Sequence, residues 1–412
     1  MKIAVITTSF PCLSETFILN QITGLIDLGH DVRVIAWRDS ADSVVHPDVA
    51  RYNLRARTRY IPPVPQSKAL CLIKALQLIV TNLPKGPGPL LRFVHMFARR
   101  RKGLSLQHLY FLLYFLDDGF DVIHCHYGPN GLIGAFLKEA GINSKVGTVF
   151  HGFDVSRYPL TSGLDVYNTL FEKCDLCMPI SEYWKHRLVE LGCKPDNIVV
   201  HRMGIDLQRF ACVDRKYDAG PFKLLTLGRL VEKKGHEYVL RAIAKLIDKG
   251  YDVAYTVAGD GPLRDSLEAL AAHLGIGSHV TFAGPVTGDE AIMLYHSAHI
   301  FLLPSVTAAD GDMEGVPVVL MEALATGMPA VASDHSGIGE IIIDGETGFL
   351  VPERDVDALA ERVQYLLDNQ QLWPATGRQG RSLVEEQYDI SKLNRKLELT
   401  YRQLWAGEKP RT

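Results

Sequence analysis

The chain has 412 residues, which is too many for one ordinary hydrophobic core and suits two domains of about 200 residues each. Its apolar share of 47% and charged share of 22% are ordinary globular values, and its net charge of −3 is close to neutral. No uninterrupted apolar run of about eighteen residues occurs, so the composition excludes a membrane span.

The cysteines and the start of the chain bear on the compartment. Seven cysteines, an odd number and scattered, favour reduced thiols in a cytoplasmic protein. Cys174 and Cys177 form a lone C-x-x-C without a second pair for zinc, and we interpret them as small buried residues. Residues 1–8 form too short an apolar run for a signal peptide and predict a first strand.

The first elements form a β-α-β unit. Lys2–Thr8 predicts a buried strand, Ser14-Glu15-Thr16 opens a helix that Gly29 ends, and Asp31–Trp37 predicts the next strand. Such a unit requires a parallel sheet, and ligands bind at the carboxyl ends of parallel strands. Ser14 and Glu15 are therefore expected at a crevice. The loop lacks G-x-G-x-x-G, so a nicotinamide cofactor is not supported.

A basic insertion follows, at about residues 51–110. It contains twelve of the 44 basic residues and no acidic residue, so the rest of the chain carries 32 basic against 47 acidic groups. The apolar stretches Ala69–Val80 and Leu90–Phe97 alternate with these charges. An anionic membrane surface attracts such segments, at roughly 1 kcal/mol per basic side chain. The alternatives are a solvated helical face and a nucleic-acid site, but the patch is local and no nucleic-acid motif accompanies it.

Histidines end two further predicted strands. Asp121–His126 ends in His124 and His126, and Lys145–Phe150 is followed by His151 and Gly152. His151 is therefore expected at the crevice, where glycine allows close backbone approach. A structural histidine and a functional one both remain possible at this position.

A candidate phosphate site opens the second half. Phe222–Leu227 predicts a strand, after which Gly228-Arg229 and Lys234-Gly235 precede a helix from His236. Arginine can hold phosphate oxygens in a bidentate manner and lysine adds a point charge, so Arg229 and Lys234 predict a diphosphate clamp. The alternative is a pair of surface cations on a βα loop.

A second strand–loop–helix unit lies between residues 299 and 334. The strand His299–Leu303 leads into a helix from about Pro317, which Gly327 ends before the strand Ala330–Ala332. The exposed amides at the helix start suit a phosphate.

Two carboxylates, Glu314 and Glu322, bracket this helix start. On one helix they would lie about 12 Å apart along the axis at roughly 1.5 Å per residue, too far for a glycosidase pair. The spacing instead fits one extended ligand with hydroxyls at both ends. The simpler alternative is a helix-dipole acid and a solvated glutamate.

These residues carry a family resemblance. Glu314-x7-Glu322, with Gly-Val-Pro-Val-Val-Leu-Met between, resembles the signature of retaining glycosyltransferases of family 4, which have the GT-B fold. The G-R-L…K-G motif around Arg229 and Lys234, the Gly204-Ile205-Asp206 junction and the Gly259-Asp260-Gly261-Pro262 turn also match. Ser-Glu-Thr-Phe, at residues 14–17, resembles a subgroup associated with bacterial exopolysaccharide assembly, although the glycine pair common in this loop is absent.

The resemblance implies roles for individual residues. Arg229 and Lys234 would hold the diphosphate, and the Gly315 and Val316 amides would assist them. Glu322 would accept hydrogen bonds from the ribose, and the loop with Val286 would cover the base. Glu314 and His151 would orient the donor sugar, while Ser14, Glu15 and His126 face the acceptor side.

The resemblance also implies that neither cofactor nor metal is used. Asp310 and Asp312 near Glu314 would suit a metal, but cations and a helix end replace it in such enzymes.

The sequence therefore predicts an α/β protein with two Rossmann-like domains facing a cleft. Residues 1–205 would bind the acceptor, residues 206–385 the nucleotide sugar, and residues 386–412 would form a helix returning to the first domain. We expect a retaining glycosyltransferase that moves a hexose from a UDP- or GDP-sugar to a lipid-linked glycan in bacterial exopolysaccharide synthesis. It would be cytoplasmic and peripheral on the inner membrane face. The alternatives are a GT-B epimerase, a soluble-glucan synthase or a non-catalytic nucleotide-sugar-binding regulator.

Overall fold

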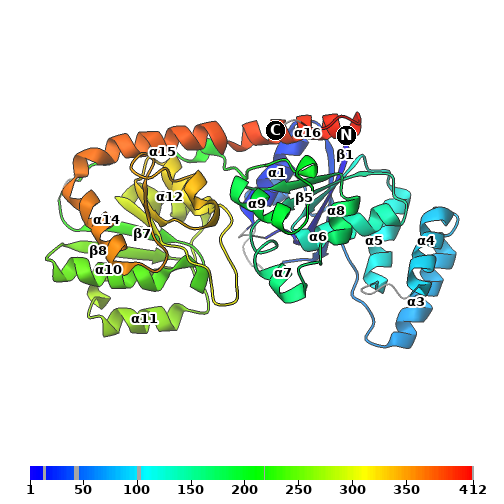
Figure 1. Cartoon of the computed structure of the whole chain (residues 1–412), viewed down its shortest axis with the longest axis horizontal. Coiled ribbons are helices and arrows are strands. Elements are labelled where there is room, and N and C mark those ends of the chain that lie inside the picture. The colour runs from blue at the N-terminus through cyan, green and yellow to red at the C-terminus, as the bar shows by residue number, and fades with distance from the viewer. Residues whose placement is uncertain (13–14, 41–45, 100–103, 218, 411–412) are drawn as a thin grey trace.

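The structure, a computed structural model, describes residues 1–12, 15–40, 46–99, 104–217 and 219–410. Two lobes lie side by side along the longest axis, and each is built on its own parallel sheet (Figure 1). The predicted pair of Rossmann-like domains is confirmed.

The N-terminal lobe contains a six-stranded sheet of order β3-β2-β1-β4-β5-β6. Its strands are β1 (Lys2–Ser9), β2 (Asp31–Arg38), β3 (Thr58–Tyr60), β4 (Val122–His126), β5 (Lys145–Phe150) and β6 (Leu176–Pro179). All neighbours pair in parallel. Their carboxyl ends therefore share one edge, as the sequence predicts for β1, β2, β4 and β5. β3 is too short to be predicted from its alternation.

Helices cover both faces of this sheet. They are α1 (Thr16–Asp27), α2 (Pro47–Arg51), α3 (Lys68–Asn82), α4 (Pro87–Ala98), α5 (Leu106–Asp117), α6 (Gly128–Glu139), α7 (Arg157–Ser162), α8 (Asn168–Lys173) and α9 (Glu182–Glu190). The predicted end of the first helix is confirmed, because Gly29 follows α1 at φ +86°. At the start of α9 the Ser181 hydroxyl accepts a hydrogen bond from the Trp184 amide.

The C-terminal lobe repeats this architecture with a sheet of order β12-β11-β10-β7-β8-β9. Its strands are β7 (Phe222–Leu227), β8 (Val253–Ala258), β9 (Val280–Gly284), β10 (Ile300–Leu303), β11 (Ala330–Ser333) and β12 (Phe349–Val351). Its helices are α10 (His236–Asp248), α11 (Arg264–His273), α12 (Gly288–Ser297), α13 (Val318–Ala325) and α14 (Val356–Asp368). The central strand β10 is buried throughout, as expected for a strand covered on both faces.

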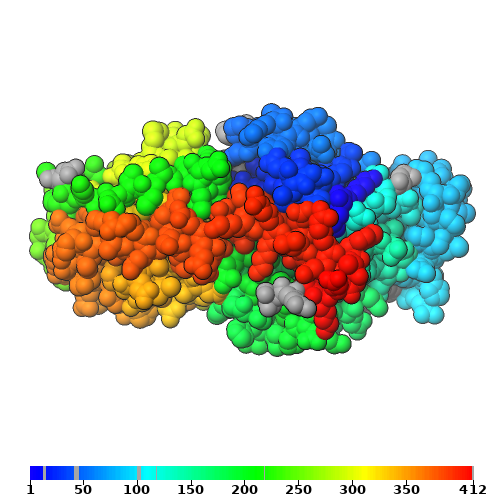
Figure 2. All heavy atoms as spheres, turned by 90° about the horizontal axis from the view of Figure 1, so that it is seen from above, coloured from blue at the N-terminus to red at the C-terminus, as the bar shows by residue number. Residues whose placement is uncertain are grey.

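Two C-terminal helices tie the lobes together. α15 (Trp373–Gln387) packs against α13, and α16 (Ile390–Trp405) packs against α1 in the other lobe. From above they form one band across both lobes (Figure 2). The predicted crossing is confirmed, but it uses two helices in place of the single helix expected at residues 386–412. α15 begins at Trp373, and Asp389 caps a separate α16.

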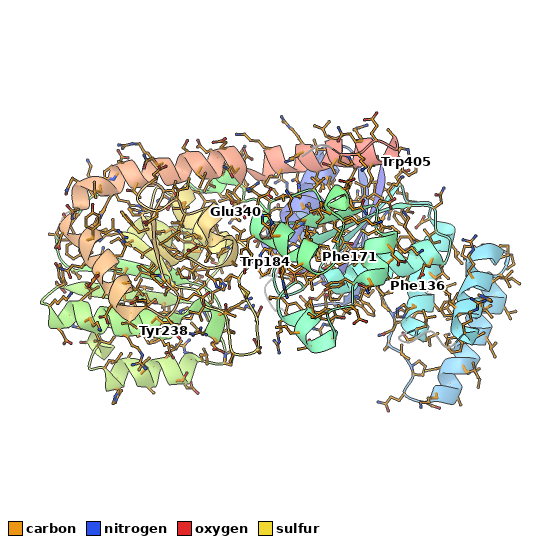
Figure 3. All side chains as sticks on the ribbon, in the orientation of Figure 1. Phe136, Phe171, Trp184, Tyr238, Glu340 and Trp405 are labelled. Carbon is orange, nitrogen blue, oxygen red and sulfur yellow. The ribbon has the colours of Figure 1, made fainter. Side chains whose placement is uncertain are left out.

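The lobes also meet beside this crossing. Glu340 lies at the boundary near Trp184 (Figure 3). Its carboxylate accepts hydrogen bonds from Arg202 Nη2 and from the Tyr183 amide, each at 3.0 Å. Within the described ranges, no helix is both long and apolar enough to cross a membrane.

Candidate active site

A cleft with a cavity of about 500 Å³ lies between the lobes. Its walls include residues from the loops that follow parallel strands: Glu15, Tyr127 and His151 from the N-terminal lobe, and Gly228 and Glu314 from the C-terminal lobe. Ligand sites of open α/β sheets occur at these carboxyl ends. Ser14 lies outside the described residues.

The predicted clamp residues lie on one wall of the cleft. Arg229 is exposed beside Gly228 at the end of β7, and Lys234 is buried at the end of a short 3₁₀ helix (Glu232–Lys234). Gly235 has φ +67°, and a Cβ there would lie 1.9 Å from the Pro304 carbonyl oxygen. This close approach brings the loop after β7 against the loop after β10.

Glu314 and Lys234 form a buried ion pair. Lys234 Nζ lies 3.2 Å from Glu314 Oε2, and Lys233 Nζ lies 3.9 Å from Oε1 and 3.0 Å from Asp312. Burial alone would raise the pKa of the Glu314 carboxyl, but the two ammonium groups outweigh it and lower the pKa. Oε1 has no hydrogen-bond partner in the described part of the chain, so it can accept a bond from a ligand hydroxyl.

A second set of contacts fixes the backbone at Glu314. The Glu314 amide donates to His335 Nε2 at 3.1 Å, and His335 Nδ1 lies 2.5 Å from Glu353 Oε1. The Ser336 hydroxyl donates to the Glu314 carbonyl at 2.8 Å. Glu314 therefore lies in a loop before α13 that these hydrogen bonds hold in place. Only Glu322 lies on the helix, so the separation of about 12 Å expected for two glutamates on one helix does not apply.

The start of α13 presents free backbone donors. Neither the Gly315 nor the Val316 amide makes a hydrogen bond within the described segments, and both residues line the cleft. A Cβ on Gly315 would lie 2.1 Å from the His151 carbonyl oxygen, and one on Gly152 would lie 3.0 Å from the Gly315 nitrogen. The lobes thus touch backbone to backbone beside these amides.

Glu322 and Val286 lie farther along the same wall. Tyr295 donates its hydroxyl to Glu322 Oε2 at 2.8 Å, and burial raises the pKa of the Glu322 carboxyl to about 7. Val286 lies in the loop between β9 and α12, immediately before Thr287, which caps α12. These residues border the cleft together with the clamp.

The opposite wall is aromatic and histidine-rich. Glu15 lines the cleft, and its carboxylate accepts a hydrogen bond from the Tyr127 hydroxyl at 2.8 Å. The His151 ring lies between the rings of Phe17 and Tyr127, at centroid distances of 4.9 and 4.6 Å. Burial lowers the pKa of His151 to about 3, with nearby His124 adding to the effect. His151 is therefore a neutral imidazole at physiological pH.

Asp154 holds the backbone under His151. Its carboxylate accepts hydrogen bonds from the amides of His151 (2.9 Å), Gly152 (3.0 Å) and Gly128 (2.8 Å). Burial raises the pKa of Asp154 to about 6. His126 lies one layer deeper than the sequence suggests: it is buried behind His151, with Nδ1 at 3.1 Å from His151 Nε2, and does not line the main cleft.

The two aspartates beside Glu314 are engaged by cations. Asp312 pairs with Lys233, and Asp310 Oδ2 lies 3.0 Å from Arg157 Nη1 across the cleft. No group of three metal-ligating side chains gathers in the part of the chain that the structure describes.

Sequence reasoning missed several residues of the site. Lys233, Tyr127 and His335 act through partners distant in sequence. Asp154 bonds to the nearby amides of His151 and Gly152 and to the distant amide of Gly128. The only local signal was the doubled lysine at 233–234.

Comparisons with known proteins agree with this geometry. Residues 14–209 match the model of Glycosyltransferase Family 4, and residues 214–383 match that of Glycosyl transferases group 1. WcaL of Escherichia coli K12, named as a colanic acid biosynthesis glycosyltransferase, is 36% identical over 96% of this chain and 98% of its own. The amylovoran biosynthesis glycosyltransferase AmsK of Erwinia amylovora is 38% identical over 87% of this chain and 89% of its own.

A solved structure shows the same fold. HepE of Anabaena, in complex with UDP-glucose, superposes with a TM-score of 0.75 over 98% of this chain and all of its own, at 16% identity. The two lobes, the intervening cleft and full-length relatives at this level of identity lead to one conclusion. The chain belongs to family 4 of the glycosyltransferases and is a glycosyltransferase of the GT-B fold.

Proposed function

We propose that this glycosyltransferase moves a hexose from a nucleoside-diphosphate sugar to a lipid-linked glycan during bacterial exopolysaccharide synthesis, with retention of anomeric configuration. One observation supports it above all. Two cations, two amides and one oxygen of a buried glutamate converge on one cleft from the C-terminal lobe, and neither these amides nor this oxygen has a hydrogen-bond partner among the described residues.

The donor would lie along this wall. Arg229 and Lys234 hold the diphosphate and neutralise the charge that develops on the leaving group, with help from the Gly315 and Val316 amides. Glu322 accepts hydrogen bonds from the ribose, and Val286 covers the base. An ionised Glu322 is the stronger acceptor for such bonds, so the raised pKa makes donor binding stronger as pH rises through about 7.

The donor sugar would occupy the gap between the lobes. Glu314 Oε1 accepts a bond from one sugar hydroxyl, and His151 contacts the sugar from the opposite wall. The close contact of Gly152 with Gly315 excludes water beside the reacting centre, which favours transfer over hydrolysis.

The names of the relatives support the biological role. WcaL and AmsK are named for colanic acid and amylovoran biosynthesis, both matched over most of their length. HepE, which shares the fold, was solved with UDP-glucose, and this supports a UDP-sugar as the first donor to test.

The basic insertion supports a membrane-bound acceptor. It forms α3 and α4, a helical pair at the end of the N-terminal lobe farthest from the C-terminal lobe (Figure 1). Leu72, Ile73 and Leu76 on α3 are 53%, 62% and 55% exposed, beside Lys68 and Lys74. An apolar face with cations and no acids fits an anionic bilayer surface at the cytoplasmic side.

The test is nucleoside-diphosphate release from a panel of UDP- and GDP-sugars, with and without a bacterial lipid extract that contains lipid-linked glycans. We expect release from one donor, stimulated by the extract. A matched reaction with delipidated extract separates transfer from slow donor hydrolysis. Donor binding without release under every condition would contradict catalysis and support a nucleotide-sugar-binding regulator.

A further inference from the structure

A row of buried polar side chains connects helix α16 to the cleft. The Tyr401 hydroxyl bonds to His124 Nδ1, His124 Nε2 lies 3.2 Å from His126 Nε2, and His126 Nδ1 lies 3.1 Å from His151 Nε2. His151 Nδ1, the last nitrogen of the row, lies 3.2 Å from Met203 Sδ. His151 and Met203 both line the cleft.

All hydrogen bonds along this row must run in the same direction. Both nitrogens of His124 and of His126 are engaged within it, and these rings are at most 1% exposed. Burial lowers the pKa of all three histidines, so each ring is neutral and carries a single N–H. If one ring reverses its donor and acceptor nitrogens, the others must reverse as well.

Tyr401 decides between the two directions. Its buried hydroxyl has His124 as its one hydrogen-bond partner within the described ranges. If His124 donated to the tyrosine oxygen, the hydroxyl hydrogen would have no acceptor, which is costly in a buried site. Tyr401 therefore donates, the N–H groups follow in sequence, and His151 accepts at Nε2 and carries its hydrogen on Nδ1.

We propose that Tyr401, acting through His124 and His126, fixes the tautomer of His151 so that Nδ1–H donates to a hydroxyl of the bound sugar. The thioether that Nδ1 meets here is a weak acceptor, so a sugar hydroxyl would be a better partner. This inference rests on the proposed function for the role of His151 as the substrate contact. Tyr401, His124 and His126 are positioning residues.

The packing around Tyr401 is consistent with this role. Gly147 on β5 lies directly opposite His124 on β4, and a Cβ on Gly147 would lie 3.6 Å from Tyr401 Cε1. The tyrosine ring therefore lies over this position of the sheet, beside the His124 ring. Because α16 is the helix that returns from the C-terminal lobe, the crossing itself completes the donor-side site.

The experiment combines a tautomer readout with kinetics. Nitrogen-15 spectra of histidine-labelled protein, with the His151 signal assigned by its loss in His151→Asn, distinguish a protonated Nδ1 from a protonated Nε2. The test variant is Tyr401→Phe, which keeps the ring. The matched control is Tyr388→Phe, another buried tyrosine between α15 and α16, whose hydroxyl faces the Glu340 carbonyl instead.

We expect Nδ1–H at His151 in the wild type and in Tyr388→Phe, and a mixture of tautomers in Tyr401→Phe. Transfer should fall roughly tenfold in kcat in Tyr401→Phe with little change in KM for the donor, as for one misdirected hydrogen bond. In a His151→Asn background, Tyr401→Phe should cause no further loss.

Two results of the tautomer measurement would overturn the inference. An Nε2–H tautomer at His151 in the wild type refutes it, even if Tyr401→Phe does not fold. An unchanged His151 signal in folded Tyr401→Phe also refutes it, whatever the rate. If the tautomers behave as expected but no donor is turned over by the wild type, the row stands as inferred and the proposed function fails instead.

Discussion

The two lobes build their walls of the cleft in different ways. The C-terminal wall comes from three short segments, residues 228–235, 286–287 and 313–322, and its groups are cations, acids and backbone amides. The N-terminal wall draws Glu15, Tyr127, His151 and Met203 from segments spread over almost two hundred residues, and its rings are neutral. Binding a diphosphate needs charge and amides, which one βα loop can supply. Positioning a neutral sugar needs aimed side chains, which only packing can supply.

The largest expected effect tests the charged wall. Arg229→Ala should lower transfer by roughly 10²-fold or more, as for one removed charge-stabilising donor. Arg241→Ala, an exposed arginine on α10 that pairs loosely with Glu237, is the matched control and should retain activity. Rates of product formation at saturating donor measure both. Near-normal turnover by Arg229→Ala would remove the clamp from the mechanism.

The second prediction concerns the place where the two walls touch. Gly315→Ala puts a Cβ 2.1 Å from the His151 carbonyl oxygen, so the lobes must separate. A shift near 1 Å in a reacting pair can cost about 10²-fold, and we expect a loss of about tenfold to a hundredfold in kcat. Gly277→Ala, where the added atom meets nothing within 4 Å, is the control. Unchanged activity with unchanged circular dichroism would show that this contact is not needed.

The third prediction concerns how the free energy of unfolding depends on pH. Burial lowers the pKa of a set of histidines, four of them in the N-terminal lobe: His124, His126, His151, His201 and His236. Below pH 6.5 these histidines become protonated in the unfolded chain but stay neutral in the folded chain. They therefore stabilise the folded state above pH 6.5, and this stability is lost as pH falls. Asp154 and Glu322, whose pKa values are raised, oppose this between about pH 4 and their folded values of about 6 and 7.

The histidines outnumber the opposing carboxyls, so the net effect is acid destabilisation. Each net proton changes the free energy of unfolding by about 1.4 kcal/mol per pH unit. Urea unfolding of the protein at pH 7.5 and at pH 5, followed by circular dichroism, measures it. Equal or greater stability at pH 5 would mean that the histidines are not neutral and buried.

The smallest effect on catalysis should come from the outer surface of the N-terminal lobe. Changing Leu72, Ile73 and Leu76 on α3 to serine should abolish sedimentation with anionic vesicles, because each apolar side chain contributes about 1.5–3 kcal/mol when buried. Turnover with a soluble acceptor should stay within about twofold, as for surface changes away from a site. Leu399→Ser on α16, equally exposed, should leave vesicle binding intact. Co-sedimentation of the triple variant with the vesicles would refute membrane docking through α3.

Most strands and helices were accessible from the sequence because their signals are local. β5 and β7 have the predicted bounds, and α10 begins at His236 as expected, since apolar runs and adjacent glycines define their ends. β3 and β12 are three residues long, too short for a periodic pattern, and α7 and α8 have only six residues each. Asp389 splits the predicted C-terminal helix because its side chain caps α16.

The residues of the candidate site likewise divide into those that local motifs predict and those that they do not. Arg229, Lys234, Glu314 and Glu322 lie within motifs whose spacing carries their chemistry, and they line one cleft. His335 and Asp154 were not predicted, because they bond to the amides of Glu314 and Gly128, which belong to other loops. The position of His126 behind His151 depends on the pairing of β4 with β5.

The sequence by itself determined which functional side chains are present and which βα loops carry them, because strand periodicity and glycine spacing are patterns within a few neighbouring residues. The tertiary structure decided which of these groups face each other. His124 and His126 share one face of β4 by alternation alone, but Tyr401 reaches His124 from 277 residues away only because α16 returns to the N-terminal lobe. Contacts of that length depend on sheet order and helix packing, which no local pattern encodes.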